Sequence, residues 1–237
     1  MVTIKKLNCG TTVIMEKSER VQSAALGIWV RAGASDEWDE VSGVSHFIEH
    51  MMFKGTKNRT AKQIAEDVDK IGGVFNAFTG KEATCYYIKT LSSNICRGAE
   101  ILLDMLTGSK FDQEEMDRER QVICEEIKMV KDTPDDDVYD TISELVAGGN
   151  PLGRSILGTP ESLAGIDRSR LVDYRDQMYA RDSIVVAVAG NFDEEAIEAI
   201  FEDRLTSLRD KKPKKEIQLK PYQQSFNVKV RDIEQTH

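Results

Sequence analysis

The sequence predicts a domain that combines β-strands with α-helices, from two kinds of pattern along the chain. Residues 1–33 contain three runs with the apolar and β-branched composition of strands, and two more lie between residues 74 and 91. Other segments carry apolar residues at the three- and four-residue spacing of amphipathic helices. A chain of 237 residues with 40% hydrophobic content can bury one substantial core.

The N-terminal stretch is expected to form adjacent antiparallel strands, with a hairpin turn at residues 8–10 between the first two. A polar loop over 34–43 then leads into a helix that Ser42 or Ser45 can cap with its hydroxyl group. Gly55 suits the position just past the end of that helix. The predicted strands cover residues 2–7, 11–17 and 23–33.

The middle of the chain combines helices with one pair of strands. β-Branched and aromatic residues predict the two strands, and Gly80-Lys81 forms the turn that joins them. The predicted elements are a helix over 61–70, strands over 74–80 and 83–91, and helices over 94–106 and 112–130.

The C-terminal part is expected to hold three more helices, a central strand over 183–190 and a linker over 209–221 before a short strand at 226–230. Asp193 is the predicted cap of the last helix. The residues expected to face the core are Val138, Ile142, Leu145 and Val146 in the first helix, Leu171, Tyr174 and Met178 in the second, and Ile197, Ile200, Phe201 and Leu205 in the third.

Composition argues against two classes of partner. The net charge of −9 disfavours general binding to nucleic acid and tolerates basic peptides better. No apolar run approaches the ~20 residues that span a bilayer, and the first residues do not resemble a signal peptide. We therefore expect no membrane insertion and a cytoplasmic protein. The four cysteines are scattered without a C-x-x-C pair, which indicates free thiols.

The chain has three histidines, and two of them, His46 and His50, lie four residues apart with Glu49 between them. At about 100° per residue, all three side chains share one face of the predicted helix. Two imidazoles so placed can donate nitrogens to one zinc ion, while the carboxylate accepts a proton from an activated water. The order His-x-x-Glu-His is the inverzincin signature. The alternative is a buried helix that tolerates a few polar residues near its end.

Two further acidic residues lie on the predicted helix over 112–130. Glu119 and Glu126 fall at about 60° and about 80° from Met116, along the edge of the apolar stripe, where an unpaired charge is costly. Either a buried group compensates both carboxylates, or they lie at the solvent boundary and pair with Arg120 or a lysine. The stripe itself is formed by Met116, Ile123, Ile127 and Val130.

Five segments follow one another along the chain: HFIEHMMFKGT, GGVFNAFTGKEATCYY, ERQVICEEI, PLGRSILGTPESL and VVAVAGNF. Together they resemble the N-terminal half of the pitrilysin/insulinase family of zinc peptidases, and most of all the bacterial and mitochondrial processing peptidases. The resemblance implies an antiparallel sheet covered by helices, an α+β half-domain that full-length members carry twice. Residues 1–210 are then the catalytic metallopeptidase half-domain, and residues 211–237 the linker and the start of a second, missing half.

The resemblance also implies a complete ligand set. The family takes its third zinc ligand from an E-R-x-V-I-x-x-E block, which matches residues 119–126 here. One zinc ion is then held by the two histidines and Glu126, which follows His50 by 76 residues, in keeping with the family spacing. Glu119 is the implied supporting carboxylate behind the ligands. Glu125 competes for the ligand role, but it points to the opposite side of the helix.

In the family, an edge strand that holds an Asn-Ala pair receives the substrate peptide as an added strand. The matching residues are Asn76 and Ala77. Main-chain hydrogen bonds in such a complex give affinity that tolerates many sequences. The alternative is an ordinary core strand in which Ala77 is present for packing.

Two functions therefore remain open. The first is a zinc metalloendopeptidase that hydrolyses peptide bonds in extended or unfolded peptides, with Glu49 as the general base. The second is a catalytically silent peptide-binding or structural subunit, or an inactive isolated half, because the family's second half helps to complete the site. The expected partners are a peptide substrate and either the second half-domain of the full-length chain or a homologous subunit, as in a dimer.

Overall fold

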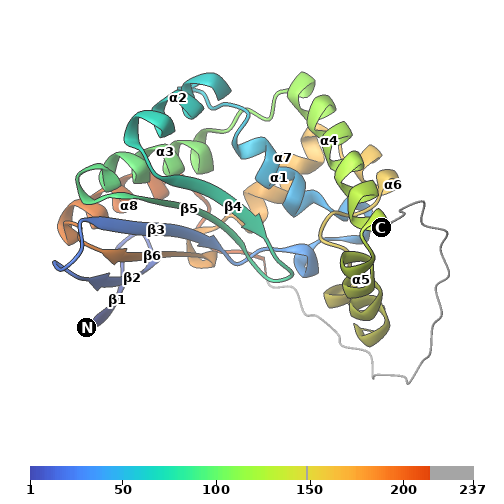
Figure 1. The fold of residues 1–237 in the computed structure, drawn as a ribbon, viewed down its shortest axis with the longest axis horizontal. Helices are drawn as coiled ribbons and strands as arrows, with labels where there is room; N and C mark the ends of the chain where they lie inside the picture. The colour runs from blue at the N-terminus through green and yellow to red at the C-terminus, as the bar shows by residue number, and fades with distance from the viewer. Residues whose placement is uncertain (148, 214–237) are drawn as a thin grey trace, which may run out of the picture.

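A computed structural model describes residues 1–147 and 149–213, and within them it shows one six-stranded sheet with helices on one face and at one end (Figure 1). This is the α+β fold that the family resemblance implies. The strands are β1 (Val2–Lys6), β2 (Thr12–Lys17), β3 (Ser23–Val30), β4 (Val74–Thr79), β5 (Thr84–Leu91) and β6 (Ile184–Gly190). The helices are α1 (Val44–Met52), α2 (Ala61–Ile71), α3 (Ile95–Gly108), α4 (Gln113–Asp132), α5 (Pro134–Ala147), α6 (Pro160–Ala164), α7 (Arg168–Met178) and α8 (Glu194–Leu205).

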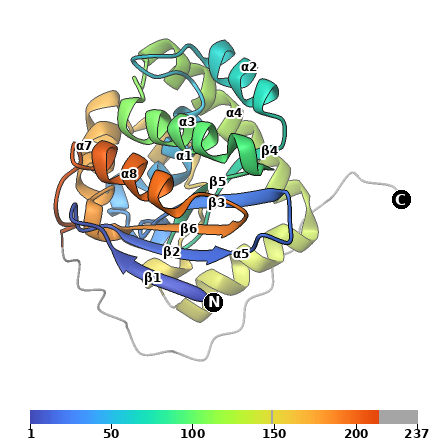
Figure 2. The same cartoon turned by 90° about the vertical axis from the view of Figure 1, so that its left-hand side faces the viewer.

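The strands lie in the order β1-β2-β6-β3-β5-β4, and all neighbours are antiparallel except β2 and β6, which are parallel. The sheet is therefore mixed. The expectation that the first three strands are adjacent is wrong for β2 and β3, because β6 lies between them (Figure 2). β6 is the central strand that its apolar run predicts, and its backbone groups pair on both sides. The local patterns of β2 and β3 carry no sign of that insertion.

Helices cover one face of this sheet. α3 packs against β3 and β5, and α8 packs on α3. The side chain of Asp193 caps α8 by accepting a hydrogen bond from the Ala196 N–H at 3.1 Å, as predicted. The predicted core residues of α7 are all buried, and those of α8 are buried except for the half-buried Ile200.

The opposite face of the sheet has no helix over it among the described residues (Figures 1 and 2). Val2, Ile4, Trp29 and Phe78 are exposed there, and the two aromatic rings meet edge to face with their centroids 5.4 Å apart. Within the described residues, the sheet is thus buried on one side. None of the described helices is long and apolar enough to cross a lipid bilayer.

α1 lies at one end of the sheet, where it packs against β4, α4 and α7 (Figure 1). Since apolar side chains fill the sides that face the core, the remaining polar residues point towards α4 and β4. The helix ends at Met52, and Gly55 follows in the next loop with a φ of 111°, a conformation that favours glycine. The buried apolar residues of α1 are Val44, Phe47, Ile48, Met51 and Met52.

α5 differs from the prediction. Val138, Ile142 and Val146 were expected to face the core, but they are 53%, 50% and 60% exposed, and Leu145 is only half-buried. The reason is position, because α5 packs against the end of α4 and the turn at Pro151–Gly153 rather than on the sheet. The predicted strand at 226–230, and the linker beyond residue 213, lie outside the described residues.

Candidate metal centre

The start of α1 is fixed by a buried carboxylate. Glu37 accepts hydrogen bonds from the backbone N–H groups of Gly43 at 2.7 Å and Ser45 at 2.9 Å. The predicted capping role of Ser42 or Ser45 is therefore wrong, since the helix begins after Gly43 with no side-chain cap of its own. Gly43 has a φ of 90°, and a Cβ atom there would lie 2.6 Å from the Leu157 carbonyl oxygen. Burial raises the pKa of Glu37 to about 7, against the opposing effect of these hydrogen bonds.

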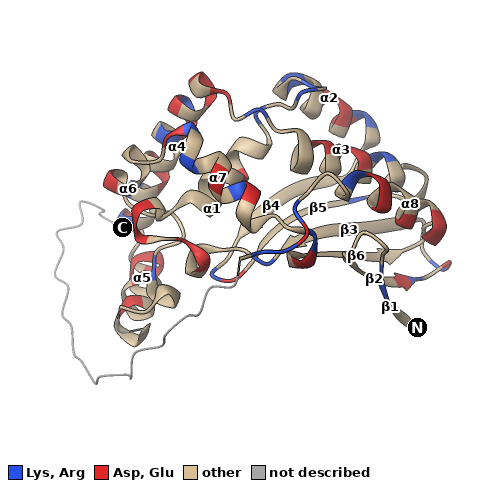
Figure 3. Ribbon diagram, turned by 180° about the vertical axis from the view of Figure 1, so that it is seen from behind, with Lys and Arg blue, Asp and Glu red and all other residues tan. Residues whose placement is uncertain are grey.

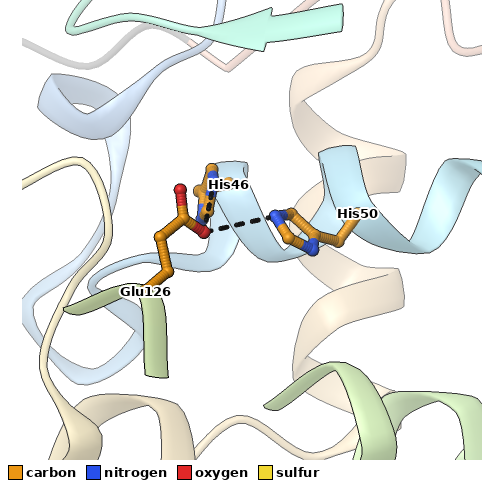
Figure 4. Close-up of side chains that lie close together, drawn as sticks. All are labelled: His46, His50 and Glu126. Atoms are coloured by element: carbon orange, nitrogen blue, oxygen red, sulfur yellow. Dashed lines mark ion pairs between the residues drawn. The ribbon is translucent and has the colours of Figure 1, made fainter. Parts of the chain in front are cut away.

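α1 and α4 bring three of the predicted residues together (Figure 4). The His46 Nε2 atom lies 3.7 Å from the Glu126 Oε2 atom, and the His50 Nε2 atom lies 3.6 Å from the same oxygen. One potential ligand atom from each residue falls within 4.8 Å of the others. We call these residues the His46–His50–Glu126 cluster.

The chemistry of this cluster fits a tetrahedral metal ion. The two N···O distances are longer than ordinary hydrogen bonds. They are close to the ~3.4 Å that separates two ligands bound at about 2.0–2.1 Å to tetrahedral zinc. His46 is 7% exposed, and its Nδ1 atom has no hydrogen-bond partner among the described residues. Three lone-pair donors thus converge on a space that a cation would fill.

The cluster also shifts the pKa values of its members. Burial, followed by the nearby His50, lowers the pKa of His46 to about 4. The neutral imidazole that metals bind is therefore favoured at this position. Burial also lowers the pKa of His50, but the carboxylates of Glu126 and Glu119 outweigh it and hold that pKa above its ordinary value. The two histidines in turn hold the pKa of Glu126 below its ordinary value.

Glu119 lies behind His50 and is 6% exposed. Its Oε2 atom is 2.9 Å from the His50 Nδ1 atom, and its Oε1 atom is 2.6 Å from the Lys54 Nζ atom. Glu119 is therefore buried rather than at the solvent boundary, and its charge is compensated by two half-buried groups, one of which is a lysine. Glu125 points away as its helical phase predicts, being exposed and paired with Lys128 at 2.7 Å.

Glu49 stands on the same helix and faces β4. The Thr79 hydroxyl donates a hydrogen bond to the Glu49 Oε2 atom. Burial raises the pKa of the Glu49 carboxyl group, although the bond from Thr79 opposes that rise. A carboxylate with a raised pKa beside a potential metal site is suited to accept and return a proton.

Asn76 and Ala77 lie on β4, which is the edge strand of the sheet next to α1. Ala77 is half-buried and lines the cleft over the cluster, whereas Asn76 is exposed. The Asn76 Oδ1 atom accepts a hydrogen bond from the Ala77 N–H at 2.9 Å. That N–H therefore points away from β5 and towards the open side of the strand.

A cleft of about 400 Å³ runs over the cluster, between β4 on one side and α4 and α5 on the other. Its lining includes His46, Glu49 and Glu126, and also Asp136 and Asp140 from α5. Acidic residues recur along α4 and α5 in Figure 3. The cleft is thus open and lined by four carboxylate side chains, those of Glu49, Glu126, Asp136 and Asp140.

Three supporting residues escaped the sequence-based reasoning: Glu37, Lys54 and Thr79. Lys54 offered a weak signal, because it is a basic residue four positions after His50, although α1 ends before it. Thr79 and Glu37 offered none, since their partners depend on how β4 and the loop before α1 pack.

Comparisons with known proteins match two successive parts of the chain. The sequence profile described as Insulinase (Peptidase family M16) matches residues 12–160, and the one described as Peptidase M16 inactive domain matches residues 165–237. All members of the His46–His50–Glu126 cluster, and Glu49, fall within the first of these ranges.

Similar sequences occur in several bacteria. The chain is 43% identical over 199 residues to a protein named uncharacterized zinc protease YmxG of Bacillus subtilis, covering 83% of this chain and 49% of that protein. It is 41% identical over 206 residues to an uncharacterized zinc protease of Rickettsia felis, covering 87% of this chain and 50% of that protein. The chain therefore spans about half the length of the curated relatives it matches.

Solved structures share the fold. A protease from Helicobacter pylori superposes with a TM-score of 0.83 at 22% identity, over 94% of this chain and 53% of that one. A peptidase M16 inactive domain from Pseudomonas fluorescens gives a TM-score of 0.84 at 18% identity, over 92% of this chain and 53% of that one.

Proposed function

The chain belongs to the insulinase family of peptidases, family M16, and from this premise we propose that it is the metal-binding half of a zinc metalloendopeptidase. The observation that carries the proposal is the His46–His50–Glu126 cluster, whose ligand atoms converge within 4.8 Å beside Glu49. The proposed substrates are extended or unfolded peptides, cleaved in the manner of a processing protease.

His46, His50 and Glu126 would hold one zinc ion. When bound there, zinc supplies a Lewis acid that polarises the scissile carbonyl group and acidifies a water molecule. Glu49 takes a proton from that water and passes it to the leaving amine, while the Thr79 hydroxyl keeps its carboxylate turned towards the cleft. Among these residues, His46, Glu49, Thr79 and Glu126 line the same cleft, which supports the proposal.

The edge of β4 is the proposed binding site for the substrate backbone. Asn76 and Ala77 are the residues that a peptide would meet as an added strand. For the Ala77 N–H to bond to a substrate carbonyl, the Asn76 side chain must turn away from it. Asp136 and Asp140 across the cleft favour substrates with basic side chains.

The proposed partner is a second half-domain, in the same full-length chain or in a homologous subunit of a dimer. The length of the relatives supports it, because this chain covers about half of each. The exposed apolar face of the sheet and the exposed apolar residues of α5 supply surfaces for such contacts. We keep a cytoplasmic location as a prediction, which the four free cysteines support and which cell fractionation tests.

A catalytically silent peptide-binding subunit is the competing function. The matched description of an inactive domain favours it only for residues 165–237, which contain no member of the cluster. The proposed ligands His46, His50 and Glu126, and the proposed base Glu49, all lie within the first 160 residues.

The substitution Glu49→Gln separates the two functions. The amide fills the same space but cannot accept the proton, so zinc content should stay at one ion per chain while cleavage of a quenched peptide disappears. Glu125→Gln, the same change on the outer side of α4, should leave both properties unaltered.

The assay should use this chain and a version that carries the second half found in relatives. Cleavage rates of peptides with basic and with acidic side chains test the proposed preference for basic substrates. Full turnover by Glu49→Gln would exclude its role as the base, and absence of cleavage by zinc-loaded protein of both lengths would favour the silent subunit.

A further inference from the structure

A chain of polar contacts runs from the loop after α1, through α4, to the cluster. Lys54 donates to the Oε1 atom of Glu119 at 2.6 Å, and the Oε2 atom of Glu119 lies 2.9 Å from the Nδ1 atom of His50. The third link lies on the other side of the imidazole ring, where Nε2 faces Glu126 at 3.6 Å. The three contacts therefore form one continuous line that ends at the proposed metal position.

From this geometry we propose that Lys54 is a positioning residue for the ligand His50 and that it acts through Glu119. The inference rests on the proposed function in one respect, namely that zinc occupies the cluster. It goes beyond that function, because it concerns how the metal-free protein holds the His50 ring in the orientation that binds the metal.

The first reason is the burial of Glu119. A carboxylate that is 6% exposed needs a partner for each oxygen, because water cannot supply one. Lys54 satisfies one oxygen and His50 satisfies the other. Without Lys54, the carboxylate would keep a single partner, and its side chain could rotate to compensate.

The second reason is the orientation of the imidazole ring. With Glu119 as acceptor, Nδ1 of His50 carries the hydrogen, and Nε2 presents its lone pair to the cluster. Outer partners of this kind fix ring orientation and typically change metal affinity by roughly 10–100-fold. Lys54 holds the acceptor Glu119 in place. Loss of Lys54 should therefore loosen the orientation of the His50 ring and weaken zinc affinity.

The pair also differs from an ordinary surface ion pair. Several ion pairs among the described residues join two side chains of one helix, such as the exposed pair of Lys128 with Glu125. Lys54 instead links the loop that follows α1 to a buried carboxylate on α4, and its own side chain is half-buried. Contacts that cross between two elements and exclude water are the ones that restrict geometry.

The test is a zinc-affinity measurement on the purified chain by competition with a chromophoric chelator. We expect Lys54→Met to bind zinc roughly tenfold more weakly, and Lys54→Arg, which keeps a charged donor, to recover most of that loss. Lys57→Met is the matched control, because it removes the same charge from an exposed lysine three residues along the same loop and should leave affinity unchanged.

A double-mutant cycle identifies the route. Glu119→Gln alone should weaken zinc by roughly 10–100-fold, and adding Lys54→Met to it should cause no further loss beyond about twofold. Thermal unfolding of the metal-free proteins checks that each variant folds. If Lys54→Met does not fold, Lys54→Gln replaces it in the same cycle. Glutamine also lacks the ammonium group, but its end is polar.

Three outcomes would overturn the proposal: wild-type affinity in the Lys54 variant, an equal loss in Lys57→Met, or the same Lys54 effect with and without Glu119. None of these touches the proposed function, which fails separately if the wild-type chain binds no zinc.

Discussion

Two polar clusters lie next to α1, and they differ in whether their polar atoms are paired in hydrogen bonds. In the His46–His50–Glu126 cluster, the Nε2 atoms of His50 and His46 lie 3.6 and 3.7 Å from one oxygen of Glu126. The second cluster, which we call the Asp104 cluster, consists of Asp104 on α3 with Thr56, Asn58 and Arg59 from the loop after α1. There the buried Asp104 carboxylate accepts hydrogen bonds from all three of the other side chains, at 2.6 to 2.7 Å.

The difference separates a structural cluster from a binding site. In the Asp104 cluster every acceptor has a donor, so the group is complete and ties the loop to α3. In the His46–His50–Glu126 cluster, the Nε2 atoms of both histidines face the same Glu126 oxygen at distances longer than ordinary hydrogen bonds. A cation from outside the chain would complete that arrangement. The first cluster should therefore govern stability and the second should govern metal binding.

The largest expected effect is the loss of zinc when one ligand is removed. His46→Ala, His50→Ala and Glu126→Gln should each weaken zinc by more than about 100-fold, beyond the loss typical of outer partners. Zinc content after dialysis against a graded chelator measures the effect.

Glu125→Gln is the control for this series, because it makes the same chemical change one residue away on the outer side of α4. Stoichiometric zinc in any ligand variant, or metal loss in Glu125→Gln with retention in Glu126→Gln, would contradict the assigned ligand set.

The next effect concerns stability alone. Asp104→Ala should lower the free energy of unfolding by about 2–3 kcal/mol, somewhat below the 3–5 kcal/mol of a fully uncompensated buried charge. The reduction is smaller because Arg59 keeps its contact with Asp67 at 3.2 Å. Urea unfolding of the metal-free protein measures it.

Zinc affinity should remain at the wild-type level in Asp104→Ala, since the two clusters share no contact among those described. A parallel loss of zinc would show that the two clusters are coupled rather than separate.

The smallest effect is a dependence on pH. Burial raises the pKa of Asp104, but hydrogen bonds from Thr56, Asn58 and Arg59 outweigh burial and hold it below the ordinary value of 3.8. Such a group stabilises the fold above pH 3.8, and its contribution is lost as the pH falls through the lower pKa of the folded state.

The difference in unfolding free energy between wild type and Asp104→Asn should thus be constant near neutral pH and shrink below pH 3.8. Urea titrations at several acidic pH values measure that difference. A difference that grows on acidification would mean that the folded-state pKa is raised instead.

The sequence by itself determined most of the elements. The apolar spacing of α7 and α8 located their buried faces, and the uninterrupted apolar run of β6 marked a central strand. It also determined which side chains share a helical face, because a helix has a fixed number of residues per turn. His46, Glu49 and His50 lie within five consecutive residues of one helix, and Glu119 and Glu126 lie along the edge of another. The relative directions of the side chains on each helix therefore follow from local geometry alone.

Only the tertiary structure decided which of these faces meet. The insertion of β6 between β2 and β3 and the exposed apolar side of α5 both depend on packing between distant segments, to which local periodicity is blind. The same holds for the supports of the proposed site: Glu37 at the start of α1, Thr79 beside Glu49, and Lys54 behind Glu119. Their partners are far away in sequence or on another element, and a hydrogen bond forms only when the fold has already brought donor and acceptor within about 3 Å.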